Sequence, residues 1–479
     1  MDVINRILKH AADFPDAIAV IGYEGTVTYS EILAMVQKIA GRLSSTPNPR
    51  VLLGLKQHVE AYALIVATLY CDGTFCSVNP NTPPFRKTQI IEEFTPDFIF
   101  LEDGDELTTN YSTYRVEDLQ FPHSHHHLHT KYDDEHIAYI IYTSGTTGKS
   151  KGVRIPRKAL NKFIEWALPT YNLKTEDVWA QFSSLSFDLS IVDIFTCLCS
   201  GAQLVALTNE AEKTYRPSDI ISRHKISIWH SVPSVVDFLM VNNRKQKSDL
   251  SSLRLMSFCG EPLLRRHVEF LFKKNPEITI FNTYGPTEGT LFCTWQEISN
   301  SNYEEYFANT CSIGNAIPGW NLQLDLTDEL DEYEVTIVGE FIGAGYLGAE
   351  GQERFITLDA SGQHVRAFKT GDVVKRENGN IYFICRKDRQ VKVKGFRIEL
   401  AEIDQRIYEA TNLSSVTFAH KNSLYSFLET TEPIIVEELR EYLKEKLEDF
   451  KIPVAFNSIA QLPRNTNQKI DVDILIAML

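Results

Sequence analysis

Residues 142–152 read YTSGTTGKSKG and combine three glycines and two lysines with a run of serine and threonine. Backbone N–H groups approach an anion closely where side chains are absent, hydroxyl groups add donors, and a lysine supplies positive charge. The spacing differs from that of the P-loop, which requires G-x-x-x-x-G-K followed by serine or threonine. Taken alone, the stretch is equally compatible with a phosphate-binding loop and with a plain glycine-rich turn.

The size and charge of the chain narrow the possibilities. Its 479 residues exceed what one hydrophobic core usually supports, so two or more domains are expected. The net charge of −15 opposes nucleic-acid binding, because a phosphate backbone requires a basic face. The eight cysteines are irregularly placed, which predicts reduced, buried thiols and neither a disulfide framework nor a zinc site.

The first residues lack the apolar stretch of a signal peptide, and no apolar run approaches the roughly 18 residues of a membrane span. We therefore expect a cytoplasmic protein without a membrane span.

Helical and strand-like patterns alternate along most of the chain. Residues 29–43 are amphipathic at helical spacing, 50–55 form a buried-strand pattern, and 59–73 form an apolar helix pattern that ends near Gly73. Such alternation predicts an α/β fold with sheets flanked by helices. After residue 385 the pattern changes to short basic strands and two helix patterns, at 401–411 and 436–450, typical of a small α+β domain. We expect a large N-terminal domain over 1–386 and a small, mobile C-terminal domain over 388–479, with a hinge near Asp388.

A histidine-rich run, FPHSHHHLHT, occupies residues 121–130. Metal binding is one interpretation of its five histidines. The run follows a proline, lacks the spacing of helical ligands and precedes the strand-like residues 138–143. Because histidine tracts are weak signals, a surface connection is the favoured interpretation.

Further motifs follow the glycine-rich stretch in a fixed order. Together with it they resemble, over essentially the whole chain, the core motifs of the adenylate-forming superfamily. The amino-acid adenylation domains of nonribosomal peptide synthetases are the most similar subfamily. Within it the stand-alone D-alanine–D-alanyl carrier protein ligases are closest, on SVPS (231–234), SFCGEP (257–262) and NTYGPTE (282–288). The other motifs are FDLS (187–190), FKTGDVV (368–374), CRKDRQVKVKGFRIEL (385–400) and NQKID (467–471).

The resemblance implies a set of residues that bind ATP. The glycine-rich stretch would hold the β- and γ-phosphates, Tyr284 would offer a face to adenine, and Asp372 would accept the ribose hydroxyls. For Gly285-Pro286 a turn is the plainer interpretation, and for Asp372 a helix N-cap. The implied ATP-binding residues are Thr143, Ser144, Gly145, Thr146, Thr147, Lys151, Asn282, Thr283, Tyr284, Gly285, Pro286, Thr287, Asp372, Phe383, Arg386 and Lys469.

Metal binding and catalysis are implied at two further positions. Glu288 is a hard oxygen ligand suited to Mg²⁺ that bridges phosphate oxygens. Lys469 matches the catalytic lysine, whose cation would stabilise the charge that builds when a carboxylate attacks the α-phosphate. Gln468 replaces the usual glycine before this lysine, and Cys385 and Tyr333 likewise depart from the family pattern.

A second half-reaction is implied by the C-terminal motifs. Asp388 matches the hinge about which the small domain turns, and Gly395 would then lie near the pantetheine arm for thioester formation.

The carboxylate substrate is indicated by Asp188. In amino-acid-activating relatives the matching aspartate pairs with the α-ammonium group, whereas a helix cap near Ser190 is the alternative role. The implied pocket favours a small side chain. His230 departs from the D-alanine pattern and resembles serine-activating domains, although a core histidine bonded to a neighbouring carbonyl is equally compatible. The pocket residues are Asp188, Leu189, Val192, His230, Ser257, Cys259, Thr283, Leu291 and Phe292.

The resulting hypothesis is an ATP-dependent, AMP-forming ligase with Mg²⁺. It would activate a small amino acid, D-alanine first and then L-serine, glycine or L-alanine. It would then load the phosphopantetheine thiol of a carrier protein, which is expected to be a separate chain because no condensation or thioesterase motif is present. The alternatives are an acyl- or aryl-CoA synthetase of the same superfamily and a non-catalytic binding protein derived from it.

Overall fold

The chain folds into two units in the computed structural model. The first comprises Met1–Pro80, Phe94–Tyr142 and Gly152–Cys385, and the second comprises Asn81–Glu93, Thr143–Lys151 and Arg386–Leu479. The second unit thus includes two short segments from the N-terminal half of the sequence. The structure describes residues 1–23, 25–105, 107, 111–115, 132–143, 150–245, 249–327, 331–348, 351–360, 363–464 and 470–479. The histidine-rich run at 121–130 lies outside these residues.

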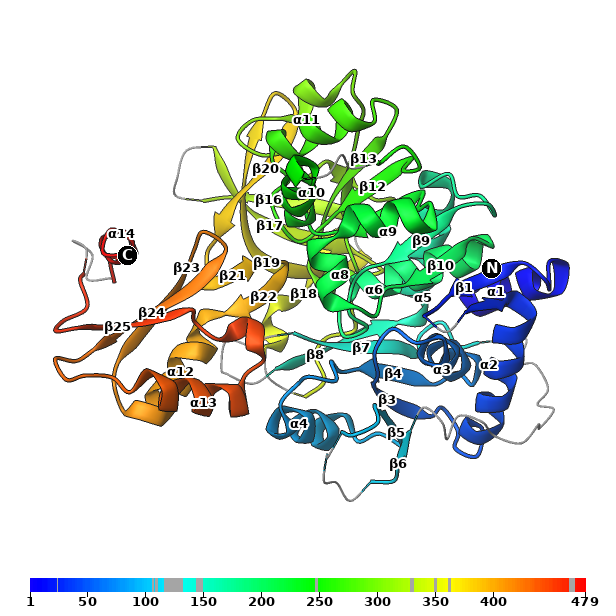
Figure 1. The fold of residues 1–479 in the computed structure, drawn as a ribbon, viewed down its shortest axis with the longest axis horizontal. Coiled ribbons are helices and arrows are strands. Elements are labelled where there is room, and N and C mark those ends of the chain that lie inside the picture. The colour runs from blue at the N-terminus through cyan, green and yellow to red at the C-terminus, as the bar shows by residue number, and fades with distance from the viewer. Residues whose placement is uncertain are drawn as a thin grey trace. The chain divides into compact units, whose positions relative to one another are not determined.

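Helices and strands alternate along most of the first unit (Figure 1). They are α1 (Val3–Asp13), α2 (Tyr29–Leu43), α3 (Val59–Tyr70), α5 (Arg157–Thr170), α6 (Leu189–Ile191), the π-helical turn η2 (Val192–Thr196), α7 (Cys197–Ser200), α8 (Glu210–Tyr215), α9 (Pro217–His224), α10 (Ser234–Lys245), α11 (Arg265–Lys274) and the short 3₁₀ turns η3 (Thr287–Gly289), η4 (Tyr303–Tyr306) and η5 (Gln352–Arg354).

The strands of the first unit form three sheets. A nine-stranded sheet has the order β15-β14-β13-β12-β11-β9-β10-β1-β2, a six-stranded sheet the order β6-β5-β3-β4-β7-β8, and a five-stranded sheet the order β16-β17-β19-β18, with β20 beside β19. The strands are β1 (Ile18–Ile21), β2 (Thr26–Thr28), β3 (Arg50–Gly54), β4 (Thr74–Ser77), β5 (Phe98–Leu101), β6 (Thr113–Arg115), β7 (Ile137–Thr143), β8 (Lys151–Pro156), β9 (Val178–Gln181), β10 (Gln203–Ala206), β11 (Ile228–Ser231), β12 (Leu255–Phe258), β13 (Thr279–Tyr284), β14 (Thr294–Ile298), β15 (Asn315–Ala316), β16 (Trp320–Leu326), β17 (Glu332–Gly339), β18 (Phe355–Ala360), β19 (Gln363–Glu377) and β20 (Asn380–Arg386).

Parallel pairing dominates the two larger sheets. Strands β1, β10, β9, β11, β12 and β13 pair in parallel, and only the edges of that sheet are antiparallel. Strands buried on both faces need apolar runs, and the buried residues of β3 and β12 show such runs. The α/β class predicted from the alternating pattern is confirmed.

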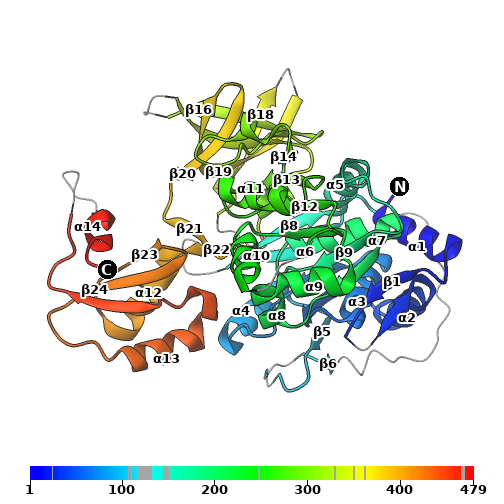
Figure 2. The same cartoon turned by 45° about the horizontal axis from the view of Figure 1, so that its top comes forward.

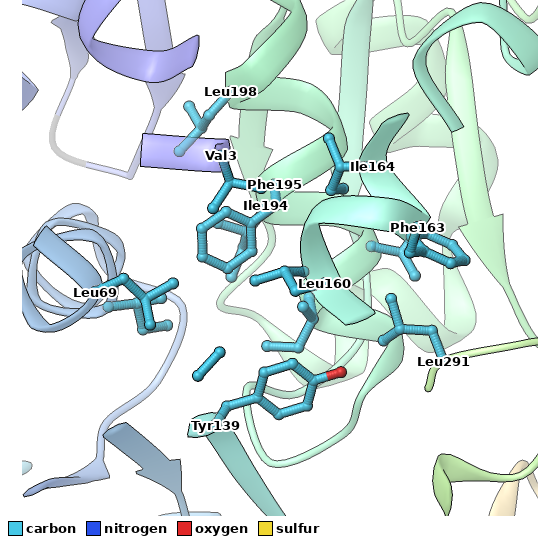
Figure 3. Close-up of a cluster of buried hydrophobic side chains, with 14 of the residues drawn as sticks. Val3, Leu69, Tyr139, Leu160, Phe163, Ile164, Ile194, Phe195, Leu198 and Leu291 are labelled. Atoms are coloured by element: carbon cyan, nitrogen blue, oxygen red, sulfur yellow. The ribbon is translucent and has the colours of Figure 1, made fainter. Parts of the chain in front are cut away.

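Among the described residues, two apolar cores hold the first unit together. One joins side chains of α1, α3, α5, α7 and β7 (Figure 3), among them Val3, Leu69, Tyr139, Leu160 and Leu198. The other lies between the strands β10–β13 and the helices α9, α10 and α11, which Figure 1 shows beside these strands. The nine-stranded sheet is therefore covered on both faces, as a parallel sheet requires.

The second unit is a small α+β structure built on a three-stranded sheet of order β23-β24-β25 (Figure 2). Alternate residues of β24 face opposite sides: Leu424 and Leu428 pack with α12 and α13, whereas Phe427 packs with α14. Its elements are α4 (Pro84–Phe94), β21 (Gln390–Val393), β22 (Phe396–Glu399), α12 (Leu400–Thr411), β23 (Ser415–His420), β24 (Ser423–Glu429), α13 (Val436–Lys446), the 3₁₀ turn η6 (Asp449–Lys451), β25 (Ala455–Ile459) and α14 (Val472–Ile476).

The end of α3 shows how close the predicted boundaries are. The helix ends at Tyr70, followed by Asp72 at φ 55° and by a hydrogen bond from Gly73 N to Thr68 O of 2.9 Å. This is the Schellman arrangement, with aspartate in the left-handed position. Gly73 is needed for another reason, since a Cβ there would lie 2.4 Å from Pro49 O. The prediction that the helix ends near Gly73 is confirmed, and the observed end, Tyr70, lies three residues before that glycine.

Membrane-spanning helices and disulfides were considered in the sequence, and the described residues bear on both. No helix among these residues is long and apolar enough to cross a membrane. None of the eight cysteines, all of which the structure describes, is joined in a disulfide, and seven of them are buried or half-buried.

Candidate active site

Four of the nine predicted pocket residues lie at the carboxyl ends of β11, β12 and β13, three adjacent parallel strands. His230 of β11 is in register with Ser257 of β12, and Ser257 with Phe281 of β13. The Thr283 hydroxyl donates to Phe258 O at 2.9 Å, and Cys259 directly follows β12. Ligands of open α/β sheets bind at the carboxyl ends of the strands. The sheet therefore brings these residues to the edge where a ligand is expected.

Asp188 stands at the start of α6. It occupies the N-cap position, yet its side chain makes no capping hydrogen bond, and its φ and ψ of −60° and −29° are already helical. A capping aspartate has extended backbone angles and accepts a backbone N–H two or three residues on. The alternative role of Asp188 as a helix cap is therefore wrong.

The segment after Asp188 carries other predicted pocket residues. Leu189 is half-buried in α6, and Val192 is fully buried at the first position of the π-helical turn η2. Single π turns inside helices are frequent at functional sites, because the extra residue redirects side chains. Val192 and Asp193 both face the protein interior.

A strained turn carries Leu291 and is followed by Phe292. Thr290 and Leu291 have φ values of 65° and 70°, a region that β-branched residues rarely adopt. The Thr290 hydroxyl donates to Phe341 O at 2.6 Å and holds this conformation. Phe292 packs edge-on against Phe163, with ring centroids 4.9 Å apart. Both predicted pocket residues are buried.

His230 is joined to a carboxylate that the sequence analysis missed. Asp193 Oδ1 accepts hydrogen bonds from Trp179 Nε1 and His230 Nδ1, each at 3.1 Å, and all three side chains are buried. Burial raises the pKa of Asp193, and the bonds from His230 and Trp179 oppose that rise. The imidazole also meets Phe292 edge-on, with ring centroids 6.1 Å apart. The alternative of His230 bonded to a backbone carbonyl is therefore not what the structure shows.

Two predicted nucleotide residues are in direct contact. The Tyr284 hydroxyl donates to Asp372 Oδ2 at 2.5 Å, and burial together with the Asp372 charge raises the pKa of Tyr284 well above its usual value. Asp372 lies inside β19, after Gly371 at φ 74° and beside a register shift between β17 and β19. The alternative of a helix N-cap is therefore wrong, because Asp372 lies in a strand, where a bulge turns its carboxylate inward.

The turn after β13 positions Glu288. Gly285 is required there, since a Cβ would lie 2.5 Å from Phe292 Cα, and Pro286 precedes the 3₁₀ turn that carries Thr287. Glu288 is fully buried, and the Tyr346 hydroxyl donates to its Oε1 at 2.6 Å. An oriented carboxylate is a suitable ligand for Mg²⁺, which takes few protein ligands and completes its shell with phosphate and water. Asn282 is held by a bond to Ser312 O.

The second unit contains the predicted hinge residue. Arg386 donates from Nε and one terminal nitrogen to the two oxygens of Asp388, at 2.7 and 2.8 Å. The pairing joins a predicted ribose contact to the predicted hinge. Gly395, at φ 81°, and Lys394, at φ 52°, form the two-residue turn between β21 and β22, where a hairpin requires positive φ at both positions.

The remaining predicted residues are placed as follows. Phe383 is half-buried in β20 and packs on the main core of the first unit. Thr143 ends β7 and Lys151 begins β8, and the Thr143 hydroxyl lies 3.5 Å from Lys151 O. Ser144, Gly145, Thr146, Thr147 and Lys469 lie outside the described residues. The structure thus brings together Tyr284 with Asp372, His230 with Ser257, and Arg386 with Asp388.

Sequence reasoning missed Asp193, Trp179 and Tyr346. Asp193 carried a usable signal, since an acidic residue inside the apolar run IVDIF must be partnered or functional when buried. Trp179 and Tyr346 gave no signal, because each is far from its partner in sequence.

Comparisons with known proteins agree with this geometry. The model of the AMP-binding enzyme family matches residues 7–351. The D-alanine–D-alanyl carrier protein ligase of Staphylococcus aureus is 29% identical over 485 residues, 98% of each chain. The chain superposes with a TM-score of 0.85 on the Vibrio cholerae adenylation domain AlmE, solved with glycyl-adenosine-5'-phosphate, at 23% identity over 99% of this chain and 97% of that one. Holo-PA1221, a nonribosomal peptide synthetase protein with adenylation and PCP domains, also gives 0.85, at 20% identity over 100% and 84%.

The likeness to these two solved structures concerns the fold. Both neighbours are adenylation domains with a large N-terminal and a small C-terminal domain, and this likeness confirms the predicted fold class. The family match covers well over half of the chain and includes all the predicted substrate residues. The chain therefore belongs to the family of AMP-binding enzymes, and the predicted class of enzyme, an ATP-dependent AMP-forming ligase, is confirmed.

Proposed function

We propose that the chain activates a small amino acid with ATP and transfers it to a separate carrier protein. D-alanine is the leading substrate, followed by L-serine, glycine and L-alanine. The observation that carries the amino-acid assignment is Asp188, an aspartate at a helix start that its side chain does not cap. Asp188 follows the parallel strand β9 in the chain, and its negative charge suits a pairing with the substrate ammonium group. The S. aureus relative, a ligase of D-alanine and its carrier protein, supports the substrate class.

The first step is adenylation. A carboxylate oxygen of the amino acid attacks the α-phosphorus of ATP, the bond from that phosphorus to the bridging oxygen breaks, and pyrophosphate leaves. Tyr284, oriented by Asp372, would stack on adenine, and Asp372 would accept the ribose hydroxyls. Glu288 would hold Mg²⁺, which neutralises charge on the phosphate oxygens. Lys469 would place its ammonium group near the attacking and α-phosphate oxygens, where charge develops.

The second step forms the thioester. The phosphopantetheine sulfur of the carrier attacks the carbonyl carbon of the aminoacyl-adenylate, its thiol proton is released, and AMP leaves. We propose that the second unit turns about Asp388 between the two steps, removing Lys469 and bringing the Lys394-Gly395 turn to the pantetheine arm. Rotation about a hinge is an established way to use one site twice. The demand for ATP implies a cytoplasmic location.

Pyrophosphate exchange tests the proposal. Incorporation of labelled pyrophosphate into ATP is measured with D-alanine, L-alanine, glycine, L-serine and benzoate, with and without coenzyme A. Exchange with one small amino acid supports the proposal and names the substrate. Exchange with benzoate alone, or thioester formation only on coenzyme A, contradicts it and indicates an acyl- or aryl-CoA synthetase.

Asp188→Ala supplies the matched variant. It should abolish amino-acid-dependent exchange while nucleotide binding, measured by titration with a fluorescent ATP analogue, remains within about twofold. Loss of nucleotide binding as well would contradict the assignment of Asp188 to the ammonium group.

A further inference from the structure

Asp193 is a buried carboxylate beside the predicted amino-acid site that has no role in the reaction described above. It lies five residues after Asp188, in the π-helical turn η2, and its side chain is fully buried. An ionisable group is expensive to bury, so its presence in an apolar segment requires a reason beyond folding. Among the described residues, Nε2 of His230 is a buried atom without a hydrogen-bond partner.

The contacts of Asp193 fix the state of one imidazole. Trp179 of β9 and His230 of β11 both direct an N–H at Oδ1 of Asp193, each over 3.1 Å. An ionised carboxylate offers only acceptors, so the ring nitrogen that contacts Oδ1 acts as a donor beside the Trp179 N–H. When the imidazole carries a single proton, that proton is therefore at Nδ1, and Nε2 carries a lone pair.

The orientation of the ring follows from the same bond. Turning the imidazole over would place a carbon against Asp193 and break the hydrogen bond, so the ring is held in one of its two orientations. Nε2 is directed away from Asp193, on the ring that meets Phe292 of the predicted pocket edge-on. A buried ring nitrogen without a partner is costly unless a ligand or a water pairs with it.

We propose that Asp193 is a positioning residue of the amino-acid site: it locks His230 in the Nδ1–H form and orientation, so that Nε2 is presented to the bound small amino acid. The assignment of the ligand rests on the proposed function. The state of the ring does not, since it follows from contacts present without substrate. Asp193 touches no reacting atom in this role and acts through His230.

Steady-state kinetics test the role in binding. Asp193→Asn keeps the volume and removes the carboxylate. We expect KM for the amino acid to rise about tenfold or more, because a hydrogen bond from His230 to a charged carboxylate is lost. KM for ATP should stay within about twofold. Asp237→Asn is the matched control, since Asp237 accepts from His267 at 3.2 Å in a partly exposed pair of α10 and α11. It should change neither constant. An unchanged KM for the amino acid, or equal rises in both constants, would overturn the proposal.

Nitrogen NMR tests the state of the ring without turnover and without reliance on a variant's folding. In ¹⁵N-histidine-labelled wild-type protein, the signal of His230, identified by its loss in His230→Gln, should show a protonated Nδ1 and an unprotonated Nε2. A proton at Nε2 in the wild-type protein overturns the proposal. In Asp193→Asn the two forms should mix. The NMR signal of His230 therefore reports on the positioning role of Asp193. Amino-acid-dependent pyrophosphate exchange by the wild-type protein reports on the proposed function, so the two can fail independently.

Discussion

The hydroxyl of Tyr284 donates a 2.5 Å hydrogen bond to Asp372, which lies 88 residues further along the chain in another sheet. β13 of the nine-stranded sheet thereby meets β19 of the five-stranded sheet at two residues that the sequence predicts to bind adenine and ribose. The bond fixes the plane of the aromatic ring and leaves the carboxylate at a defined position. A nucleotide would therefore find both contacts in place before it binds.

Removing this hydrogen bond should weaken ATP binding selectively. Tyr284→Phe keeps the ring but frees Asp372, so we expect KM for ATP to rise about fivefold, as the loss of one hydrogen bond implies, with KM for the amino acid unchanged. Asp372→Asn should raise it further, because the carboxylate itself is lost. ATP titrations of pyrophosphate exchange provide the measurement. Tyr425→Phe, in β24 of the second unit, serves as control, and a matching rise there would contradict the assignment.

The Tyr346–Glu288 contact makes a prediction about magnesium. Tyr346→Phe removes the donor that orients Glu288 Oε1, so we expect the Mg²⁺ concentration for half-maximal exchange to rise several-fold. At saturating Mg²⁺ the rate should recover to near the wild-type value. A rate that stays low at all Mg²⁺ concentrations would show that Tyr346 acts on something other than the metal ligand.

The N-terminus is tied to the first unit by a pH-dependent contact. Asp2 caps α1 and accepts two hydrogen bonds from the buried guanidinium of Arg157, at 2.7 and 3.1 Å. Burial raises the pKa of Asp2, but the bonds and charge of Arg157 outweigh it and lower that pKa overall. The stabilisation is therefore present at neutral pH and is lost as the pH falls through the lowered pKa, below 3.8.

We expect Asp2→Asn to lower the free energy of unfolding of the first unit by about 1–3 kcal/mol at pH 7. The difference from the wild-type protein should shrink below about pH 4. Urea unfolding followed by tryptophan fluorescence measures it, since all five tryptophans lie in this unit. Asp13→Asn, at the exposed end of the same helix, should show no such pH dependence. A difference of the same size at every pH, with no decrease on acidification, would contradict the assignment to the Asp2 charge.

A buried charge network stabilises the second unit. Glu402 accepts from Arg86 and Lys451, each at 2.9 Å, and Lys451 also lies 2.8 Å from Glu448. Burial lowers the pKa of Lys451, but the two carboxylates raise it overall, so the lysine stays charged. Glu402→Gln would leave two buried cations undercompensated, which typically costs about 3–5 kcal/mol.

Hydrogen exchange read by mass spectrometry should report this loss locally. Peptides from α12 and α13 should exchange faster in Glu402→Gln, whereas those from α9 and α10 of the first unit should not change. Glu409→Gln on the same helix removes a partly exposed pair with Arg406 and should have a small effect. Equal effects of the two substitutions would show that burial of the network adds nothing.

Much of the fold was predictable because it depends on local pattern. The amphipathic spacing of residues 29–43 gave α2 with both boundaries correct, and the capping box of Thr28 and Glu31 explains where it starts. The helix pattern at 436–450 extended too far. The α-helix ends at Lys446, and a separate 3₁₀ turn carries Lys451 into the charge network.

The site was predictable only where motifs encode it. Tyr284, Glu288 and Asp188 lie in short stretches whose residue types suit the chemistry, so sequence alone could suggest them. Their partners could not be found in the same way: Asp372 and Tyr346 reach Tyr284 and Glu288 from 88 and 58 residues away. Such pairings are created by strand order, which the periodicity of a single segment does not contain.

Lys469 offers the sharpest separation of the two half-reactions. Its cation would be needed where charge develops on the α-phosphate but not in the attack of a thiol on a finished adenylate. Lys469→Ala should therefore slow amino-acid-dependent pyrophosphate exchange at least 100-fold, the loss typical of removing one charge-stabilising group. Transfer from a supplied aminoacyl-adenylate to the carrier should stay within about twofold. Lys421→Ala, an exposed lysine of the second unit, should affect neither step. Equal loss of both half-reactions in Lys469→Ala would refute the proposed exchange of the second unit between two positions.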